Sequence, residues 1–172
     1  MLDPLARPVA NRESYAIRPS GPMARLPYQA AFSQAEYALI RRGLIPAEMD
    51  DKWFIFWEAD SLYLHRSWTG HQVYRVEFQP MGSGFEVAQA TVTSDATFYH
   101  RGPDSDEAAL LDFLIRGLLL HQPVEFPLPS SARTSSSAGL YQHHIAGTGF
   151  PERRLPRTEA TLLSKIRGWL GL

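Results

Sequence analysis

Aromatic and charged side chains alternate along the stretch from Lys52 to Glu77, which holds most of the residue types that could do chemistry. Aromatic rings can stack on a planar ligand, and arginine, lysine and histidine can hydrogen-bond an anion. If these side chains share a surface, they favour a small anionic ligand that carries an aromatic ring, such as a nucleotide or an ADP-ribose-like group. The candidate ligand-binding residues are Lys52, Phe54, His65, Arg66, Ser67, Arg75 and Glu77.

The same residues also have a purely structural interpretation. An antiparallel sheet commonly packs one face on the core and leaves the other face solvated. Here the short helix after Ser33 or the N-terminal arm would cover that second face. His65 and Arg75 would then bridge to Glu77 or to backbone carbonyls. Both interpretations remain open at the level of the sequence.

Arg66 is exceptional, because strand alternation places it on the apolar face near Trp53 and Tyr74. An unpaired charge in that position would be strongly destabilising through desolvation. We expect the guanidinium either to stack on Trp53 and pair with Asp50, Asp51 or a helix C-terminus, or to hold a phosphate or carboxylate of a ligand.

The residue types of a catalytic set are present, but their spacing argues against one. His65 and Ser67 are two positions apart on one predicted strand, roughly 7 Å, which is too far for the direct hydrogen bond between a serine nucleophile and its base. No Gly-x-Ser-x-Gly turn exposes a nucleophile. An enzyme built on His65 with Glu58 or Glu77 is an alternative, but we favour a protein without catalytic activity.

Motifs for metals and cofactors are missing from the sequence. The chain has no cysteine, His143 and His144 are adjacent, and no His-x-x-x-His or His-Glu-x-x-His spacing occurs. Two short Gly-x-Gly pieces, at 82–84 and 147–149, lead into no predicted helix and therefore do not resemble phosphate-binding loops. We expect neither a metal ion nor a cofactor.

Three strands with short turns are predicted between Lys52 and Phe78. A two-residue turn at Ala59-Asp60 joins the first two strands, and a three-residue turn at Thr69-Gly70-His71 joins the second to the third. A fourth strand, about Phe85 to Thr93, completes an antiparallel meander. The facing pairs expected in this register are Trp57–Leu62, Ile55–Leu64, Trp53–Arg66, Arg66–Tyr74, Leu64–Val76, Leu62–Phe78, Phe54–His65 and His65–Arg75.

Three helices are predicted around this meander. Ser33-Gln-Ala-Glu36 has the spacing of a capping box and predicts a helix over 34–42. Asp104-Ser-Asp-Glu107 repeats that spacing before a long helix over 108–121 that is apolar on almost every side. An amphipathic helix follows over 159–170. The predicted fold class is therefore α+β, with an antiparallel β-meander of about four strands packed on a long apolar helix and flanked by shorter helices.

Composition and charge restrict the class of protein. The chain has 172 residues, no cysteine and a formal net charge of -1, from 17 basic and 18 acidic residues. It is therefore not a disulfide scaffold, and it lacks the overall positive field that favours nucleic-acid binding. No apolar run approaches the roughly 20 residues of a membrane span, and no signal peptide is evident. We expect a cytoplasmic protein with no membrane and no nucleic-acid partner.

Proline, glycine and serine content divides the chain into four parts. We predict an irregular N-terminal arm over 1–24 and an α+β domain over 25–128. A serine-rich linker over 129–138 and a C-terminal segment over 139–172, which holds the amphipathic helix, complete the chain.

Three stretches, Asp51-Lys-Trp-Phe54, Leu64-His-Arg-Ser-Trp-Thr-Gly70 and Leu110-Leu-Asp-Phe-Leu-Ile115, together resemble a bacterial domain family that has no assigned mechanism. The resemblance extends from about Met49 to Pro127. It implies an association with a neighbourhood of ADP-ribosylglycohydrolase genes, and it transfers no catalytic residue to this chain.

The leading functional hypothesis is a small module that binds an anionic aromatic ligand on a polar-aromatic sheet face. The alternative is a protein-interaction or oligomerisation module. In that case the open sheet face or the terminal helix would bury its aromatic side chains against another chain, including a second copy of this one.

Overall fold

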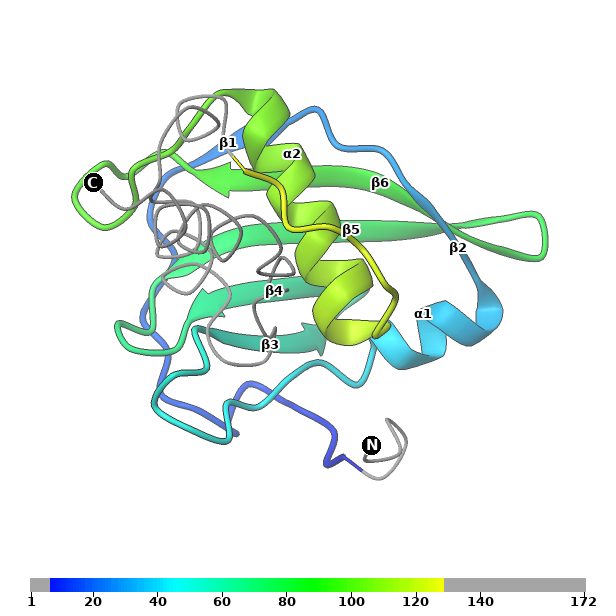
Figure 1. Cartoon of the computed structure of the whole chain (residues 1–172), viewed down its shortest axis with the longest axis horizontal. Coiled ribbons are helices and arrows are strands. Elements are labelled where there is room, and N and C mark those ends of the chain that lie inside the picture. The colour runs from blue at the N-terminus through cyan, green and yellow to red at the C-terminus, as the bar shows by residue number, and fades with distance from the viewer. Residues whose placement is uncertain (1–6, 129–172) are drawn as a thin grey trace, which may run out of the picture.

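A six-stranded antiparallel sheet forms the centre of the computed structural model, which describes residues 7–128 (Figure 1). The strands are β1 (Met23–Leu26), β2 (Ala31–Ser33), β3 (Trp53–Glu58), β4 (Ser61–Arg66), β5 (Gln72–Met81) and β6 (Gly84–Thr93). Their order is β1-β6-β5-β4-β3, and β2 also pairs with β6. The fold is α+β, as predicted. The sheet has six strands instead of about four, because β1 and β2 both pair with β6.

The β3–β4 hairpin has the predicted register. Ala59 and Asp60 form its two-residue turn with φ values of 46° and 57°, a backbone geometry whose twist matches that of the flanking strands. Trp57 faces Leu62 across the hairpin. The apolar alternation of the two strands, with a two-residue turn between them, was therefore sufficient to predict this pairing.

The β4–β5 hairpin has a different register from the predicted one. Leu64 faces Tyr74, and Arg75 faces Tyr63 instead of His65. The reason is that the connection between the two strands covers 67–71, instead of the predicted three-residue turn Thr69-Gly70-His71. The displacement amounts to two residues over most of the hairpin. Since side chains alternate with a period of two, this displacement leaves the same side chains on the same face.

Helix α1 (Gln34–Ile40) begins with the predicted capping box. The backbone N–H of Glu36 donates to Ser33 Oγ at 3.2 Å, and the backbone N–H of Ser33 donates to Glu36 Oε2 at 2.8 Å. Gly43 follows the helix with a φ of 66°. A Cβ at Gly43 would lie 2.2 Å from the carbonyl oxygen of Ile55, so only glycine fits between α1 and β3.

The predicted long helix consists of ten residues of α-helix, α2 (Asp104–Phe113), followed by six residues of π-helix, η2 (Leu114–Leu119). It begins earlier than predicted, with Pro103 at the N-cap and no side-chain cap. It is also less apolar than predicted, because Asp112 and Arg116 form an ion pair at 3.0 Å on its partly exposed side. The expectation of a long apolar helix is therefore not confirmed.

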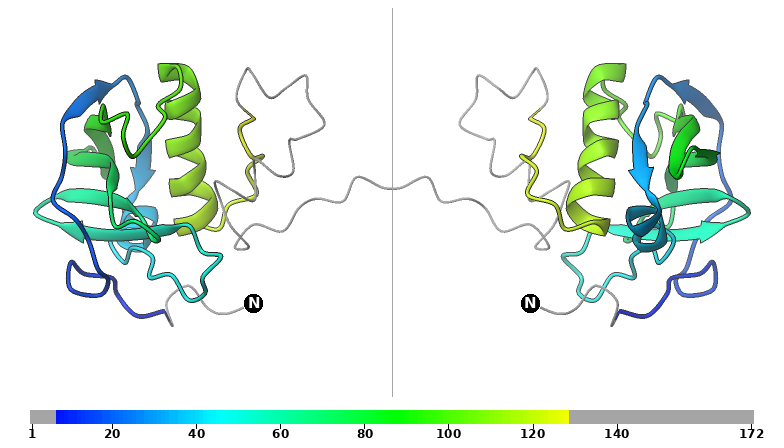
Figure 2. Two further views of the ribbon diagram at one scale, coloured as in Figure 1. Left: turned by 90° about the vertical axis from the view of Figure 1, so that its left-hand side faces the viewer. Right: turned by 90° about the vertical axis from the view of Figure 1, so that its right-hand side faces the viewer.

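The sheet separates two apolar layers (Figure 2). On one side, α2 and η2 pack on the main core, which includes Leu62, Leu64, Tyr74, Val76, Leu111 and Ile115. On the other side, the N-terminal arm, residues 7–22, packs Ala10, Tyr15 and Ile17 around Phe54 and Phe56. Both faces of the sheet are therefore covered at β3 and β4, while Arg75 and Glu77 of β5 remain partly exposed on the side of the arm.

Hydrogen bonds hold the N-terminal arm in place along the sheet. The N–H of Ala10 donates to the Arg42 carbonyl at 2.8 Å, and the N–H of Arg18 donates to the Gly70 carbonyl at 2.9 Å. Arg12 forms an ion pair with Glu58 at 2.9 Å. The arm has no helix or strand before Met23, where β1 begins inside the predicted arm.

None of the helices within residues 7–128 is long and apolar enough to cross a membrane. The predicted serine-rich linker and the predicted helix over 159–170 lie outside the described residues.

Candidate functional site

Phe54 and His65 lie side by side as predicted, but the N-terminal arm covers them. Both side chains are buried, and their ring centroids are 6.3 Å apart. The Nδ1–H of His65 donates to the Gly70 carbonyl at 2.9 Å, and its Nε2 has no hydrogen-bond partner within the described part of the chain. Burial lowers the pKa of His65, and the positive charge of Arg12 adds to this effect. His65 is a neutral buried side chain in this arrangement.

Arg75 and Glu77 remain partly exposed on the same sheet face. They form an ion pair at 3.0 Å, and the Arg75 guanidinium lies over the Tyr63 ring, 5.5 Å from its centroid. Arg75 also donates to Ser61 Oγ at 3.3 Å. The structural interpretation of the sequence, with His65 bonded to a carbonyl and Arg75 paired with Glu77, is therefore confirmed. Glu58 and Glu77 have arginine partners, so neither carboxylate is engaged with His65.

Lys52 and Ser67 lie at one end of the sheet. The Lys52 ammonium is 4.2 Å from the centroid of Trp68 and 3.8 Å from Asp50 Oδ1. The Ser67 hydroxyl donates to the Asp51 carbonyl at 2.6 Å. These contacts fix the start of β3 against the loop after β4.

Arg66 stacks on Trp53, as the sequence predicted, with its guanidinium carbon 4.6 Å from the ring centroid. Its charge also acts on Tyr99, which places it on the helix side of the sheet, away from His65. The seven predicted residues therefore lie in four separate environments and are not brought together at one place.

A buried carboxylate in the main core was missed by the sequence analysis. Glu107 accepts hydrogen bonds from the hydroxyls of Tyr74 and Tyr99, the latter at 2.8 Å, and from the N–H of Gly102 at 2.6 Å. Burial raises the pKa of both tyrosines, so both phenols keep their protons and act as donors. Glu107 thereby joins the start of α2 to the centre of the sheet.

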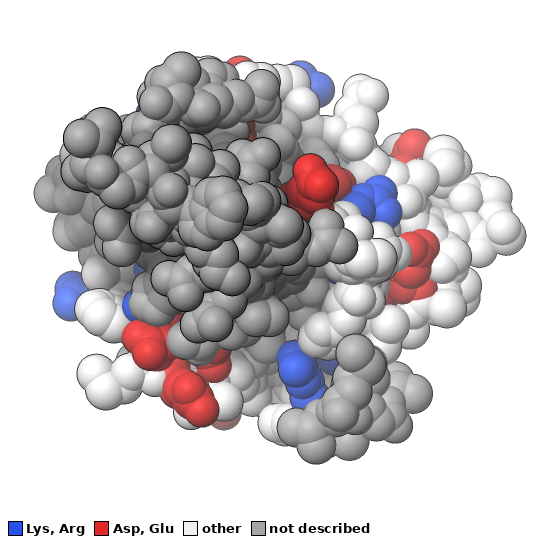
Figure 3. All heavy atoms as spheres, in the orientation of Figure 1, with Lys and Arg blue, Asp and Glu red and all other residues white. Residues whose placement is uncertain are grey.

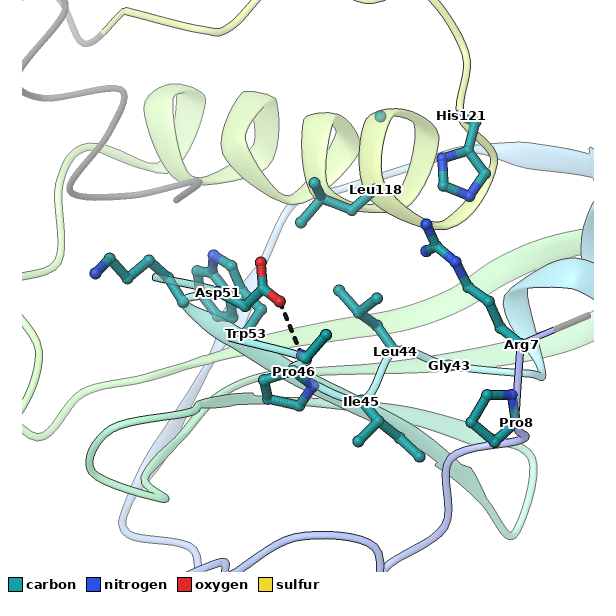
Figure 4. Close-up of a pocket in the computed structure, with 13 residues that line it drawn as sticks. Arg7, Pro8, Gly43, Leu44, Ile45, Pro46, Asp51, Trp53, Leu118 and His121 are labelled. Carbon is teal, nitrogen blue, oxygen red and sulfur yellow. Dashed lines mark hydrogen bonds between the residues drawn. The ribbon is translucent and has the colours of Figure 1, made fainter. Parts of the chain in front are cut away.

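A cavity of about 510 Å³ lies between the N-terminal arm, the loop before β3 and the end of η2 (Figure 4). This volume is within the usual range for small-molecule sites, roughly 300–1,000 Å³. Apolar side chains bound its middle, and the charged or titratable side chains that line it are Arg7, Asp51, Lys52 and His121. The Asp51 carboxylate accepts from the N–H of Ala47 at 2.8 Å. The residues used below are Arg7, Leu44, Lys52, Trp53, Leu118 and His121.

The polar end of the cavity is formed by Arg7 and His121, whose side chains point toward one another (Figure 4). Burial lowers the pKa of His121, and the Arg7 charge lowers it further. His121 has a φ of 54°, which is uncommon for a residue other than glycine and is found most often at functional or structurally constrained positions.

The π-helix supplies the cavity wall next to His121. Gly117 and Leu118 of η2 line the cavity, and the Gln122 N–H closes the helix by donating to the Arg116 carbonyl at 2.9 Å. Single π-helical turns inside α-helices occur frequently at functional sites.

Few features of the sequence predict this cavity. Arg7 lies in an irregular stretch, and His121 follows a run of leucines. Only Lys52 is shared between the cavity and the predicted ligand-binding residues. Within residues 7–128, no group of three or more histidines, aspartates and glutamates is arranged to hold a metal ion.

Comparisons of the chain with protein-family models, with curated proteins and with solved structures found no match. The functional argument therefore depends on the geometry of the chain itself.

Proposed function

We propose that the protein binds a small anionic ligand with an aromatic body, and that it does so in the cavity between Trp53 and His121. The observation that carries the proposal is the combination of an apolar middle with a cationic end in one cavity of suitable volume. The same ligand class was expected on the sheet face, where Phe54 and His65 are buried beneath the arm. A nucleotide or an ADP-ribose-like group has the required chemistry.

In this proposal the anionic group lies between Arg7 and His121. A guanidinium forms two parallel hydrogen bonds with a phosphate or carboxylate, and a neutral imidazole contributes one N–H donor. The apolar body extends along Leu44 and Leu118 towards Trp53, where burial of its surface adds affinity.

Calorimetric titration of the full chain with AMP, ADP-ribose and adenosine tests the proposal. We expect AMP or ADP-ribose to bind at least about tenfold more tightly than adenosine, because a charge-assisted hydrogen bond contributes about 1.4 kcal/mol or more. The variants Arg7→Ala and His121→Asn should each weaken binding by a similar factor. Asparagine is chosen because it tolerates the positive φ of residue 121.

The matched control is Arg25→Ala, which removes the same charge from an exposed position on β1 and should leave affinity unchanged. A bound anion favours protonated His121, so affinity should also rise between pH 8 and pH 6, and His121→Asn should remove most of that rise. Equal affinity for AMP and adenosine, or an Arg7→Ala variant that binds normally, would refute the proposal.

A further inference from the structure

Three large apolar side chains are exposed on neighbouring loops at one end of the sheet. Met49, Trp68 and Phe98 are 83%, 67% and 54% exposed. Trp68 Nε1–H donates to the Met49 carbonyl, and Phe98 stacks on His71 of the Trp68 loop with ring centroids 3.6 Å apart. We call these three side chains the apolar end. Side chains of this size are normally exposed singly, and a group of them marks an interaction surface.

The loop that carries Met49 is acidic. Glu48, Asp50 and Asp51 surround Met49 in the sequence, and Figure 3 shows acidic side chains gathered over this loop on the face that it displays. Across residues 7–128, 15 acidic residues outnumber 11 basic ones. The apolar end is therefore suited to a basic and apolar occupant.

The C-terminal part of the same chain has the complementary composition. Residues 129–172 contain six basic and two acidic residues. The pattern over 159–170 places apolar side chains on one side of a predicted helix and two cations on the other. The apolar side chains are Leu162, Leu163, Ile166, Trp169 and Leu170, and the cations are Lys165 and Arg167.

The end of the described chain leaves this segment free to reach the apolar end. Residues 120–128 run back beside α2 (Figures 1 and 2), with Phe126 packed on Phe113 at a centroid distance of 5.0 Å. The thirty residues between 129 and 158 can extend roughly 100 Å. The connecting residues are therefore long enough for residues 159–170 to reach the apolar end.

From the exposed apolar end, the acidic loop and the basic amphipathic pattern, we infer that residues 159–170 dock on the apolar end of their own chain. The leucine and tryptophan side chains of the segment cover Met49, Trp68 and Phe98, and Lys165 and Arg167 lie near the acidic loop. The acidic loop also borders the proposed ligand cavity, which Asp51 and Lys52 line, but the docking contact does not depend on a bound ligand.

Because the chain has few lysines, amine-specific cross-linking can test this inference. Lys52 and Lys165 are the only two lysines in the sequence, and the Lys52 ammonium lies over Trp68 of the apolar end. A short amine-reactive cross-linker, applied to a mixture of unlabelled and ¹⁵N-labelled full chain, should give a Lys52–Lys165 linked peptide within single chains. Links between labelled and unlabelled chains would identify a second copy as the occupant and overturn the inference.

The variant Leu162→Asp/Ile166→Asp should lose this cross-link, whereas Leu140→Asp/Ile145→Asp, which introduces the same charges outside the segment, should keep it. Because Lys52 is only 13% exposed, hydroxyl-radical oxidation of Met49 and Trp68 provides a second readout on the same proteins. We expect severalfold faster oxidation in Leu162→Asp/Ile166→Asp than in the unaltered chain or the control. Equal oxidation rates in all three proteins would overturn the inference, whatever the cross-linking yield.

Discussion

At the scale of single residues, Glu107 is the buried charge with the clearest structural role. Its carboxylate accepts from Tyr74, Tyr99 and Gly102. If the carboxylate were removed, one tyrosine hydroxyl could still donate to the other, 3.0 Å away, but the second hydroxyl and the Gly102 N–H would lose their acceptor. We predict that Glu107→Ala lowers the free energy of unfolding by about 3 kcal/mol, because buried donors without an acceptor are costly. Urea denaturation followed by tryptophan fluorescence measures this change.

Asp104→Ala is the control for that prediction. Asp104 lies three positions earlier on α2 and pairs with Arg101, but its side chain is about half exposed, so its loss should cost at most about 0.5 kcal/mol. Comparable losses in the two variants would show that Glu107 has no special role. From its spacing to Asp104, the sequence predicted Glu107 as half of a capping box, but the N-cap is Pro103 and no side chain caps the helix. The partner tyrosine on β5 is 33 residues away, and no local pattern reports such a contact.

At the scale of elements, the turn between β3 and β4 carries a local strain that can be relieved. Ala59 and Asp60 both have positive φ, which costs an alanine about 1 kcal/mol. Asparagine and glycine are the preferred residues of such a turn. We predict that Ala59→Asn/Asp60→Gly raises the free energy of unfolding by about 1 kcal/mol, as measured by urea denaturation.

The opposite substitution at the next two-residue turn is the control. Gly82 also has a positive φ, of 58°, and a Cβ there would meet no atom within 4 Å. Gly82→Ala should therefore be destabilising through backbone strain alone. If both turns respond in the same direction, the strain argument fails.

The same two hairpins show which elements can be predicted from sequence. The Ala59-Asp60 turn and the Ser33 capping box depend on residues within four positions of one another, and both were predicted correctly. The register of β4 with β5 depends on a turn that begins at Ser67, which bonds to the carbonyl of Asp51. The addition of β1 and β2 to the sheet depends on contacts with the distant β6. These features are decided by tertiary contacts, to which hydrophobic periodicity is insensitive.

At the scale of the whole molecule, the N-terminal arm determines which surfaces are available to a ligand. It lacks any apolar periodicity, and the sequence analysis could name it only as one of two segments that would cover this sheet face. Packing of Ala10, Tyr15 and Ile17 on Phe54 and Phe56 removes the predicted site from solvent, and Arg7 at the start of the arm helps to form the cavity. The N-terminal arm therefore buries the predicted site on the sheet face and forms part of the candidate cavity.

Protonation of His65 makes the packing of the N-terminal arm on the sheet dependent on pH. Burial lowers its pKa below the ordinary value of 6.5, so the unfolded chain binds more protons than the folded one as the pH falls below about 6.5. The contribution of His65 to stability is therefore complete above that pH and is lost as the pH falls towards its folded pKa. Protonation would place a second N–H, without an acceptor, beneath the arm and beside the Arg12 charge.

We predict that the free energy of unfolding of the full chain decreases between pH 7.5 and pH 5, and that the decrease is smaller in His65→Gln. It should not vanish, because the pKa of His121 is lowered as well. His100→Gln, a substitution at an exposed histidine, should keep the full decrease in the free energy of unfolding.

Hydrogen exchange at pH 5 should show the effect of His65 protonation at individual backbone amides. The Arg18 amide donates to the carbonyl of Gly70 that also accepts from His65, so it should lose protection before the amides of β5 and β6. An unchanged pH dependence in His65→Gln would mean that the arm tolerates a protonated imidazole beneath it.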